Sequence, residues 1–253
     1  MPPGSGTAPV APAVWRDGNG RACAYAYAAE EALTLHLPGV GWYRVDATPE
    51  RVTAYRDPHA ADDDVVRAFH SAVLPLYLSR RGFEVLHAGA VCDSGGVTGF
   101  CATSGTGKTT LLHALTARGL AAWADDALLI APGAGGAPTT LALPPHGSSR
   151  PGTPDVGTAA PLRHLVLLER HHRRERTPTL ERIAPAAAFT ALLPHAYCLD
   201  LDSADRKRAM VERYLELCAQ VPVWTLRYAS GLQRLPRAIE LLNSKLGLGD
   251  GEQ

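Results

Sequence analysis

The sequence predicts an α/β protein in which a domain built around a phosphate-binding loop (P-loop) follows a small β-rich segment. Two observations predict this fold class. Short stretches of alternating apolar and polar residues dominate residues 22–56, and a Gly/Thr-rich loop separates an apolar run from a helical repeat over residues 96–115. We expect a disordered tail over residues 1–20, a β-rich segment with a linking helix over residues 21–82, and the P-loop domain over residues 83–245.

The first elements alternate with a period of two residues. Leu33–Leu37 and Val52–Tyr55 are the clearest stretches of this kind. The acidic run Asp62–Asp64 then opens a helix that closes at Arg80–Gly82, so that acids and cations lie where the helix dipole favours them. Pro75 lies inside this helix, and we expect a bend there.

The loop carries the most specific chemistry of the chain. Residues 102–110 read ATSGTGKTT, after a strand-like run and before leucines at helical spacing. In a P-loop, small residues let backbone N–H groups face one cavity, Lys108 reaches the β- and γ-phosphates, and the Thr109 hydroxyl ligates Mg²⁺. Ala102 replaces the motif's first glycine, and the flanking elements disfavour the alternative of a chance Gly/Thr-rich turn. The predicted nucleotide-binding residues are Ser104, Gly105, Thr106, Gly107, Lys108, Thr109 and Thr110.

The rest of this domain alternates strands and helices. Phe83–Val91 predicts one buried strand before the loop strand, and Pro144–Ala160 is a long stretch without periodicity, as is common in functional loops. The charged run Glu169–Arg176 predicts a solvated turn. Further strands are expected at 120–124, 128–130, 139–143, 165–168 and 223–228, and helices at 185–193, 204–220 and from Pro236 onward.

The composition is that of an ordinary soluble globular chain, with 46% apolar and 20% charged residues. Lys and Arg total 25, as do Asp and Glu, so no global charge recruits nucleic acid or an anionic membrane. The five cysteines are an odd number without a CxxC pair, which favours reduced thiols. No apolar run approaches the length that spans a membrane, and the N-terminus lacks the basic start of a signal peptide. We therefore expect a cytoplasmic protein.

Two aspartates and a histidine are candidates for chemistry near the loop. Asp125 and Asp126 follow a small apolar strand downstream of Lys108, where a metal-directing aspartate faces the γ-phosphate. Consecutive strand residues face opposite ways, so a turn is needed if both are to act. The alternative is a pair of exposed loop aspartates. His87 precedes the loop strand, and by position alone it is either a hydrogen-bonded core residue or a group near the phosphates.

The sequence resembles the C-terminal catalytic domain of the HPr kinase/phosphorylase family in three segments, Leu86–Val91, Ser104–Thr110 and Ala124–Asp126. The resemblance covers roughly residues 83–242. It implies a P-loop kinase core related to ATP-dependent phosphoenolpyruvate carboxykinase, which uses ATP and Mg²⁺. It also implies that Asp125 is the catalytic base, that Asp126 is its companion near the metal, and that His87 assists at the phosphoryl site. Together with the loop chemistry, this gives Asp125, His87 and Lys108 as the expected catalytic residues, and Thr109 and Asp126 as the expected metal ligands.

One stretch departs from that family. Its signature region ends in a glutamate that contacts the metal, and the corresponding residues Leu143–Arg150 contain none. The chain is more similar to compact HPr-kinase-like proteins, some of which resemble the lasso peptide kinases that phosphorylate the C-terminal serine of a precursor peptide. Arg150 carries a guanidinium that could hold a phosphate or carboxylate, and an exposed surface arginine is the equal alternative.

These observations leave three functions open. The leading hypothesis is an ATP-dependent Ser/Thr kinase that acts on a peptide or small protein. The alternatives are a small-molecule hydroxyl kinase and a nucleotide-sensing module, which would need the metal ligand but no base. The basic run 170–176 lacks interleaved aromatic residues, so we expect no nucleic-acid partner, and we expect no membrane partner either. HPr kinases are hexamers, so the resemblance leaves a homo-oligomer open.

Overall fold

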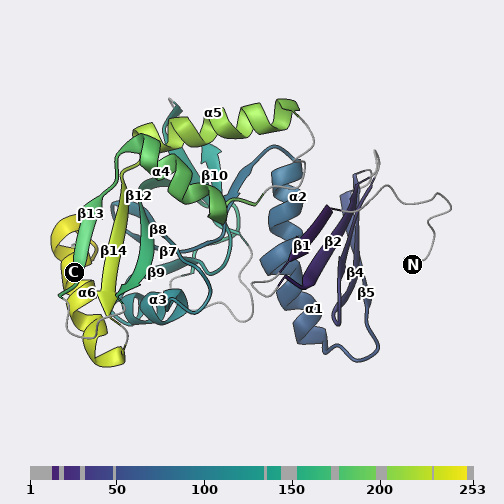
Figure 1. Cartoon of the computed structure of the whole chain (residues 1–253), viewed down its shortest axis with the longest axis horizontal. Coiled ribbons are helices and arrows are strands. Elements are labelled where there is room, and N and C mark those ends of the chain that lie inside the picture. The colour runs from purple at the N-terminus through teal and green to yellow at the C-terminus, as the bar shows by residue number, and fades with distance from the viewer. Residues whose placement is uncertain are drawn as a thin grey trace. The chain divides into compact units, whose positions relative to one another are not determined.

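The structure, a computed structural model, describes residues 13–16, 20–28, 32–47, 50–133, 136–143, 153–171, 177–197, 204–229 and 231–249. The chain divides into two compact units, Met1–Arg81 and Gly82–Gln253 (Figure 1). Both units combine strands with helices, so the predicted mixed α/β class is confirmed.

The first unit contains an antiparallel sheet whose five strands follow one another in chain order. The predicted alternation is confirmed, because Leu33, Leu35, Tyr43 and Val45 are buried while the residues between them are only partly covered. The strands are β1 (Ala13–Arg16), β2 (Ala22–Ala28), β3 (Ala32–Leu37), β4 (Gly41–Ala47) and β5 (Glu50–Arg56). Strand β1 lies within the stretch expected to be a disordered tail, and it is ordered by pairing with β2. Residues 1–12 and 17–19 of that stretch lie outside the described residues.

The helix of the first unit is continuous but irregular. It consists of α1 (Asp62–Ala68), a π-helical segment (Phe69–Val73) and α2 (Leu74–Arg80). The sequence predicted a bend at Pro75, and the structure has a π-helical segment directly before the proline-containing turn. Since proline has no N–H and its ring crowds the preceding turn, a widened turn is one way to accommodate it. The Tyr43 hydroxyl donates to the Val65 carbonyl at 2.8 Å and ties the helix to the sheet.

The second unit is built on a larger mixed sheet. Its strands are β6 (Glu84–Leu86), β7 (Ala88–Asp93), β8 (Gly96–Cys101), β9 (Ala121–Ala124), β10 (Leu128–Pro132), β11 (Pro138–Leu141), β12 (Ala159–His171), β13 (Thr179–Arg182) and β14 (Val223–Ala229). They follow the order β6-β10-β11-β12-β8-β7-β9, with β14 also paired to β12 and β13 paired to β14. Strand β12 runs parallel to both β8 and β14, with Leu165 opposite Gly99 on one side and Val223 on the other. The carboxyl ends of these three strands therefore meet at one edge.

Helices cover both faces of this sheet. They are α3 (Lys108–Thr116), α4 (Pro185–Leu192), α5 (Ala204–Gln220) and α6 (Leu235–Leu246). Alternate residues of β12 point to opposite faces: Leu165 and Leu167 pack in the cluster that includes α4 and α5, whereas Val166 and Leu168 pack in the cluster that includes α3 and α6. Figure 1 shows these two pairs of helices on either side of the strands.

Two predictions for this unit are corrected, and one strand was missed. The strand expected over 83–91 is broken at His87, because Leu86 pairs with β10 whereas Ala88 pairs with β8. The start of the expected turn at 169–176 is strand instead, because Glu169, Arg170 and His171 pair with β14. Strand β13 was not predicted, since its sequence Thr-Leu-Glu-Arg is largely exposed and has little apolar signal.

None of the described helices has the length and apolarity that crossing a bilayer requires. Four of the five cysteines, Cys23, Cys92, Cys101 and Cys218, are free thiols, and Cys198 lies outside the described residues.

Candidate phosphate-binding site

The predicted loop connects the end of β8 to the start of α3, and two glycines set its shape. Gly105 and Gly107 have φ of +79° and +99°, values that favour glycine. A Cβ atom at Gly105 would meet nothing within 4 Å, so the loop is open there. Ala102, which replaces the motif's first glycine, is buried and does not adopt a positive φ, so a side chain is tolerated at this position.

Lys108 is the first residue of α3 and its side chain is nearly buried. Its ammonium donates to a carboxylate oxygen of Asp126 at 2.8 Å and to the backbone carbonyl of Asp125 at 2.6 Å. The two acids occupy the bend between β9 and β10, so the turn that the sequence analysis required is present. Only Asp126 brings its carboxylate to the lysine, and the Asp125 side chain is exposed.

A glycine on β7 lets this turn approach α3. A Cβ atom at Gly89 would lie 2.9 Å from the Asp125 carbonyl oxygen and 2.2 Å from the Leu112 Cδ1. Since real Cβ atoms do not approach backbone oxygens so closely, any side chain at this position would displace the carbonyl that accepts from Lys108. Gly89 is therefore required for the close packing of the turn against the loop helix.

His87 lies at the break between β6 and β7, with Tyr197 beside its ring. The backbone N–H of His87 donates to the His195 carbonyl at 2.6 Å, and the ring Nδ1 lies 3.2 Å from the Tyr197 hydroxyl. Burial, and then the charge of Lys108, lower the pKa of His87, against the opposing effects of the Asp126 carboxylate and a hydrogen bond to the Asp126 backbone. His87, Lys108 and Asp126 therefore share one electrostatic environment.

His195 and Tyr197 belong to the same environment. Burial, and then the charges of His87 and Lys108, lower the pKa of His195. Burial, and then the charge of Asp126, raise the pKa of Tyr197. The backbone carbonyl of His195 accepts a hydrogen bond from the backbone N–H of His87. Sequence reasoning missed Tyr197, which carries no recognisable motif.

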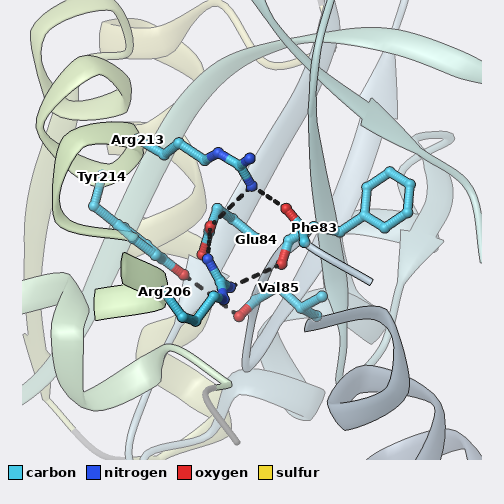
Figure 2. Close-up of polar contacts among 7 residues, drawn as sticks. Phe83, Glu84, Val85, Arg206, Arg213 and Tyr214 are labelled. Carbon is cyan, nitrogen blue, oxygen red and sulfur yellow. Dashed lines mark hydrogen bonds and ion pairs between the residues drawn. The ribbon is translucent and has the colours of Figure 1, made fainter. Parts of the chain in front are cut away.

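An ion-pair cluster around the buried Glu84 fixes β6 just before His87. Glu84 is only 4% exposed and accepts from both Nη atoms of Arg206, at 2.7 and 3.2 Å, and from Arg213 at 3.3 Å. The Tyr214 hydroxyl donates to the Val85 carbonyl at 3.4 Å. Figure 2 shows these side chains reaching from α5 to β6. The cluster anchors the strand that leads into His87 to the longest helix of the unit.

The loop is also held from the neighbouring strands. The Thr106 carbonyl accepts from the Tyr228 hydroxyl and from Arg170 Nε, each at 2.8 Å. The Thr106 hydroxyl lies 3.0 Å from that of Thr103. Sequence reasoning missed both Tyr228 and Arg170, and assigned the latter to a solvated turn.

The residues predicted to bind nucleotide and metal lie in different surroundings. Ser104, Thr109 and Thr110 are exposed in the loop and the first turn of α3, whereas Arg150 lies outside the described residues. Within the described ranges, no three His, Cys, Asp or Glu side chains gather as a ready-made metal cage. Mg²⁺ does not need one, because it is usually held by one or two protein ligands together with phosphates and water. The Asp126 carboxylate beside the loop lysine fits that mode.

No family model matches the chain, and no curated protein sequence matches it. Among solved structures, the chain is similar to the Hpr(Ser) kinase/phosphatase from Coxiella burnetii, with a TM-score of 0.40 and 12% identity. The match covers 64% of this chain and 91% of that one. At this level of similarity neither substrate nor mechanism is transferred.

Proposed function

We propose that this chain is an ATP-dependent kinase with a P-loop core, which transfers the γ-phosphoryl group to a Ser or Thr hydroxyl of a peptide or small protein. One observation carries the proposal. The nearly buried ammonium of Lys108, at the end of a glycine-shaped loop, lies 2.8 Å from the Asp126 carboxylate and 2.6 Å from the Asp125 carbonyl. Phosphoryl transfer needs a lysine for the phosphates, an acid for the metal and a second acid as base. Here the lysine is the first residue of α3, and the two acids lie together on the turn between β9 and β10.

The loop and its lysine bind the phosphates in this proposal. Backbone N–H groups of the loop and the ammonium of Lys108 neutralise phosphate charge, and Lys108 exchanges its contact with Asp126 for one with the phosphates. Thr109 and Asp126 hold Mg²⁺, which supplies further neutralisation of the charge on the phosphate oxygens. The exchange is feasible because the Asp126 side chain is 46% exposed and can be solvated when the lysine leaves.

Asp125 acts as the base. Its exposed carboxylate accepts the proton of the acceptor hydroxyl as that oxygen attacks the γ-phosphorus and the bond to the leaving ADP breaks. An exposed base suits an acceptor that is part of a peptide, because a large substrate can approach it from solvent. His87 supports the transferring group, and its lowered pKa favours the neutral ring at neutral pH.

The acceptor that we propose first is the C-terminal serine of a lasso-type precursor peptide. This choice rests on the resemblance of the sequence to compact HPr-kinase-like proteins. The test incubates the protein with ATP, Mg²⁺ and synthetic peptides that end in serine, and detects the added phosphate by mass spectrometry. The same peptides ending in alanine serve as negative controls.

Two substitutions separate binding from turnover. Lys108→Ala should weaken ATP binding and lower turnover, because it removes a phosphate contact. Asp125→Asn should keep ATP binding and remove turnover, because it removes only the base. Asp155→Asn, at another exposed acid, is the matched control. Wild-type turnover in Asp125→Asn would rule out the proposed base, and a wild-type chain that takes up no ATP in calorimetry would rule out the kinase.

A further inference from the structure

Two side chains from adjacent strands converge on a single carbonyl of the loop. The Thr106 carbonyl oxygen accepts from Tyr228 Oη and from Arg170 Nε, each at 2.8 Å. Arg170 on β12 and Tyr228 on β14 are direct partners in the parallel register. Strand β12 is also the parallel neighbour of β8, from which the loop begins. The three strands therefore bring the loop and both donors to the same edge of the sheet.

Because the peptide bond is planar, these two hydrogen bonds also fix the orientation of the next N–H group, that of Gly107. In a trans peptide the carbonyl of Thr106 and the N–H of Gly107 point in opposite directions. Since Tyr228 and Arg170 hold the carbonyl on the side of β12 and β14, the Gly107 N–H is turned to the other side of the loop. This orientation is one that the loop needs if its N–H groups are to face a phosphate.

The packing around Gly107 also supports a fixed orientation of its N–H group. A Cβ atom at this position would lie 3.1 Å from Tyr228 Oη and 3.2 Å from Arg170 Nη2, and the residue has a φ of +99°. Tyr228 is only 6% exposed. Burial raises the pKa of Tyr228, with an opposing effect of the Arg170 charge, so its hydroxyl remains a donor at neutral pH. The two donors and the glycine are tightly fitted.

We propose that Tyr228 and Arg170 are positioning residues that hold the Gly107 N–H in the orientation that binds the triphosphate. This inference rests on the proposed function. Neither side chain has to touch the nucleotide. Both side chains hold the peptide plane between Thr106 and Gly107 in place before ATP binds. The free-energy cost of ordering this part of the loop is therefore not incurred during binding.

The test compares two tyrosine variants that each lose one hydroxyl. Tyr228→Phe should weaken ATP binding about three- to tenfold in calorimetry, the effect of one typical buried hydrogen bond. Tyr43→Phe is the matched control, because Tyr43 is also buried and donates to a carbonyl at 2.8 Å, but in the first unit. It should lower the thermal midpoint and leave the ATP affinity unchanged.

Arg170→Met provides a second variant that does not depend on a buried ring. Arg170 is exposed overall, so this variant should fold, and it should weaken ATP binding by a similar factor. Arg227→Met, on the adjacent strand, is its control. Nuclear magnetic resonance adds a local readout. The Gly107 amide proton should shift on ATP addition in the wild type, and the shift should be smaller in both variants of the positioning residues.

The outcomes separate the two proposals. A wild type that binds ATP, with Tyr228→Phe and Arg170→Met variants of equal affinity and equal Gly107 shifts, would refute the positioning role and leave the kinase standing. A wild type that binds no ATP would refute the proposed function and this inference with it. Weaker binding in both variants but in neither control would support the positioning role.

Discussion

Replacing Asp126 with asparagine removes the carboxylate that faces the ammonium of Lys108. The pair is 2.8 Å apart, and the lysine side chain is 10% exposed whereas that of the aspartate is 46% exposed. Removing one partner of a fully buried pair costs about 3–5 kcal/mol, and an exposed pair contributes about 0–1 kcal/mol. Because Asp126 is half exposed and asparagine still offers an oxygen, we expect a loss of about 1–2 kcal/mol.

The assay for this loss is thermal unfolding without nucleotide. For a unit of this size a loss of 1 kcal/mol lowers the midpoint by about 2–4 °C, so Asp126→Asn should unfold about 2–8 °C lower than the wild type. Glu181→Gln is the control, because it makes the same chemical change at an exposed ion pair, in which Arg227 lies 2.8 Å away. Its midpoint should stay close to that of the wild type.

The same variant tests the role of Asp126 toward the metal. Without Mg²⁺, Asp126→Asn should bind ATP at least as tightly as the wild type. In the variant Lys108 does not have to break an ion pair to contact the phosphates, and one negative charge that repels them is gone. Added Mg²⁺ should strengthen ATP binding in the wild type and much less in the variant. An unchanged unfolding midpoint would refute the ion-pair estimate, and an unchanged gain from Mg²⁺ would refute the metal role.

Three further predictions concern packing, an ion pair and histidine protonation in the second unit. Gly89→Ala should cost about 1–3 kcal/mol and weaken ATP binding, because the new methyl group would meet the Asp125 carbonyl; thermal unfolding and calorimetry check this, and wild-type values for both would contradict it. Glu84→Gln should lower stability by about 3 kcal/mol in urea unfolding, because it leaves two guanidinium groups without their carboxylate, and a change below about 0.5 kcal/mol would show that the cluster contributes little. Burial is the largest cause that lowers the pKa of His87 and of His164 below the ordinary 6.5. As the pH falls, the unfolded chain therefore binds protons at these histidines at a higher pH than the folded chain does. The free energy of unfolding should fall as the pH drops below about 6.5. Equal urea midpoints at about pH 7.5 and about pH 5.5 would contradict this sign.

Local periodicity predicted most of the individual elements. The helix over 204–220 and the strands near 96–101 and 223–228 are present because their apolar spacing matches the faces that they bury. The break at His87 was not predictable in this way. Both halves of 83–91 are extended and rich in apolar residues, and the break arises because they pair with different strands. That choice of partner is a tertiary property and leaves no mark on the local pattern.

In the candidate site, too, the residues identified by local sequence were predicted and those brought in by strand pairing were missed. The motif alone gave Lys108, and the position of the acids after a strand gave Asp125 and Asp126. Tyr228 and Arg170 were missed because they lie 122 and 64 residues from Thr106 in sequence, and only the strand order brings them close. A partial signal existed: each lies at the end of an apolar strand, and a parallel pairing of those strands with the loop strand would have placed both beside it.

The adjacency of Arg170 and Tyr228 has an evolutionary consequence for the long connection between their strands. Side chains alternate along a strand, so sliding β14 against β12 by one position would turn one of the two donors to the opposite face. The segment between the two strands carries β13, α4 and α5. Insertions and deletions in it are therefore tolerated only where they leave the register of β14 against β12 unchanged. Related chains should vary in length within that crossover while the spacing from Val223 to Tyr228 stays constant.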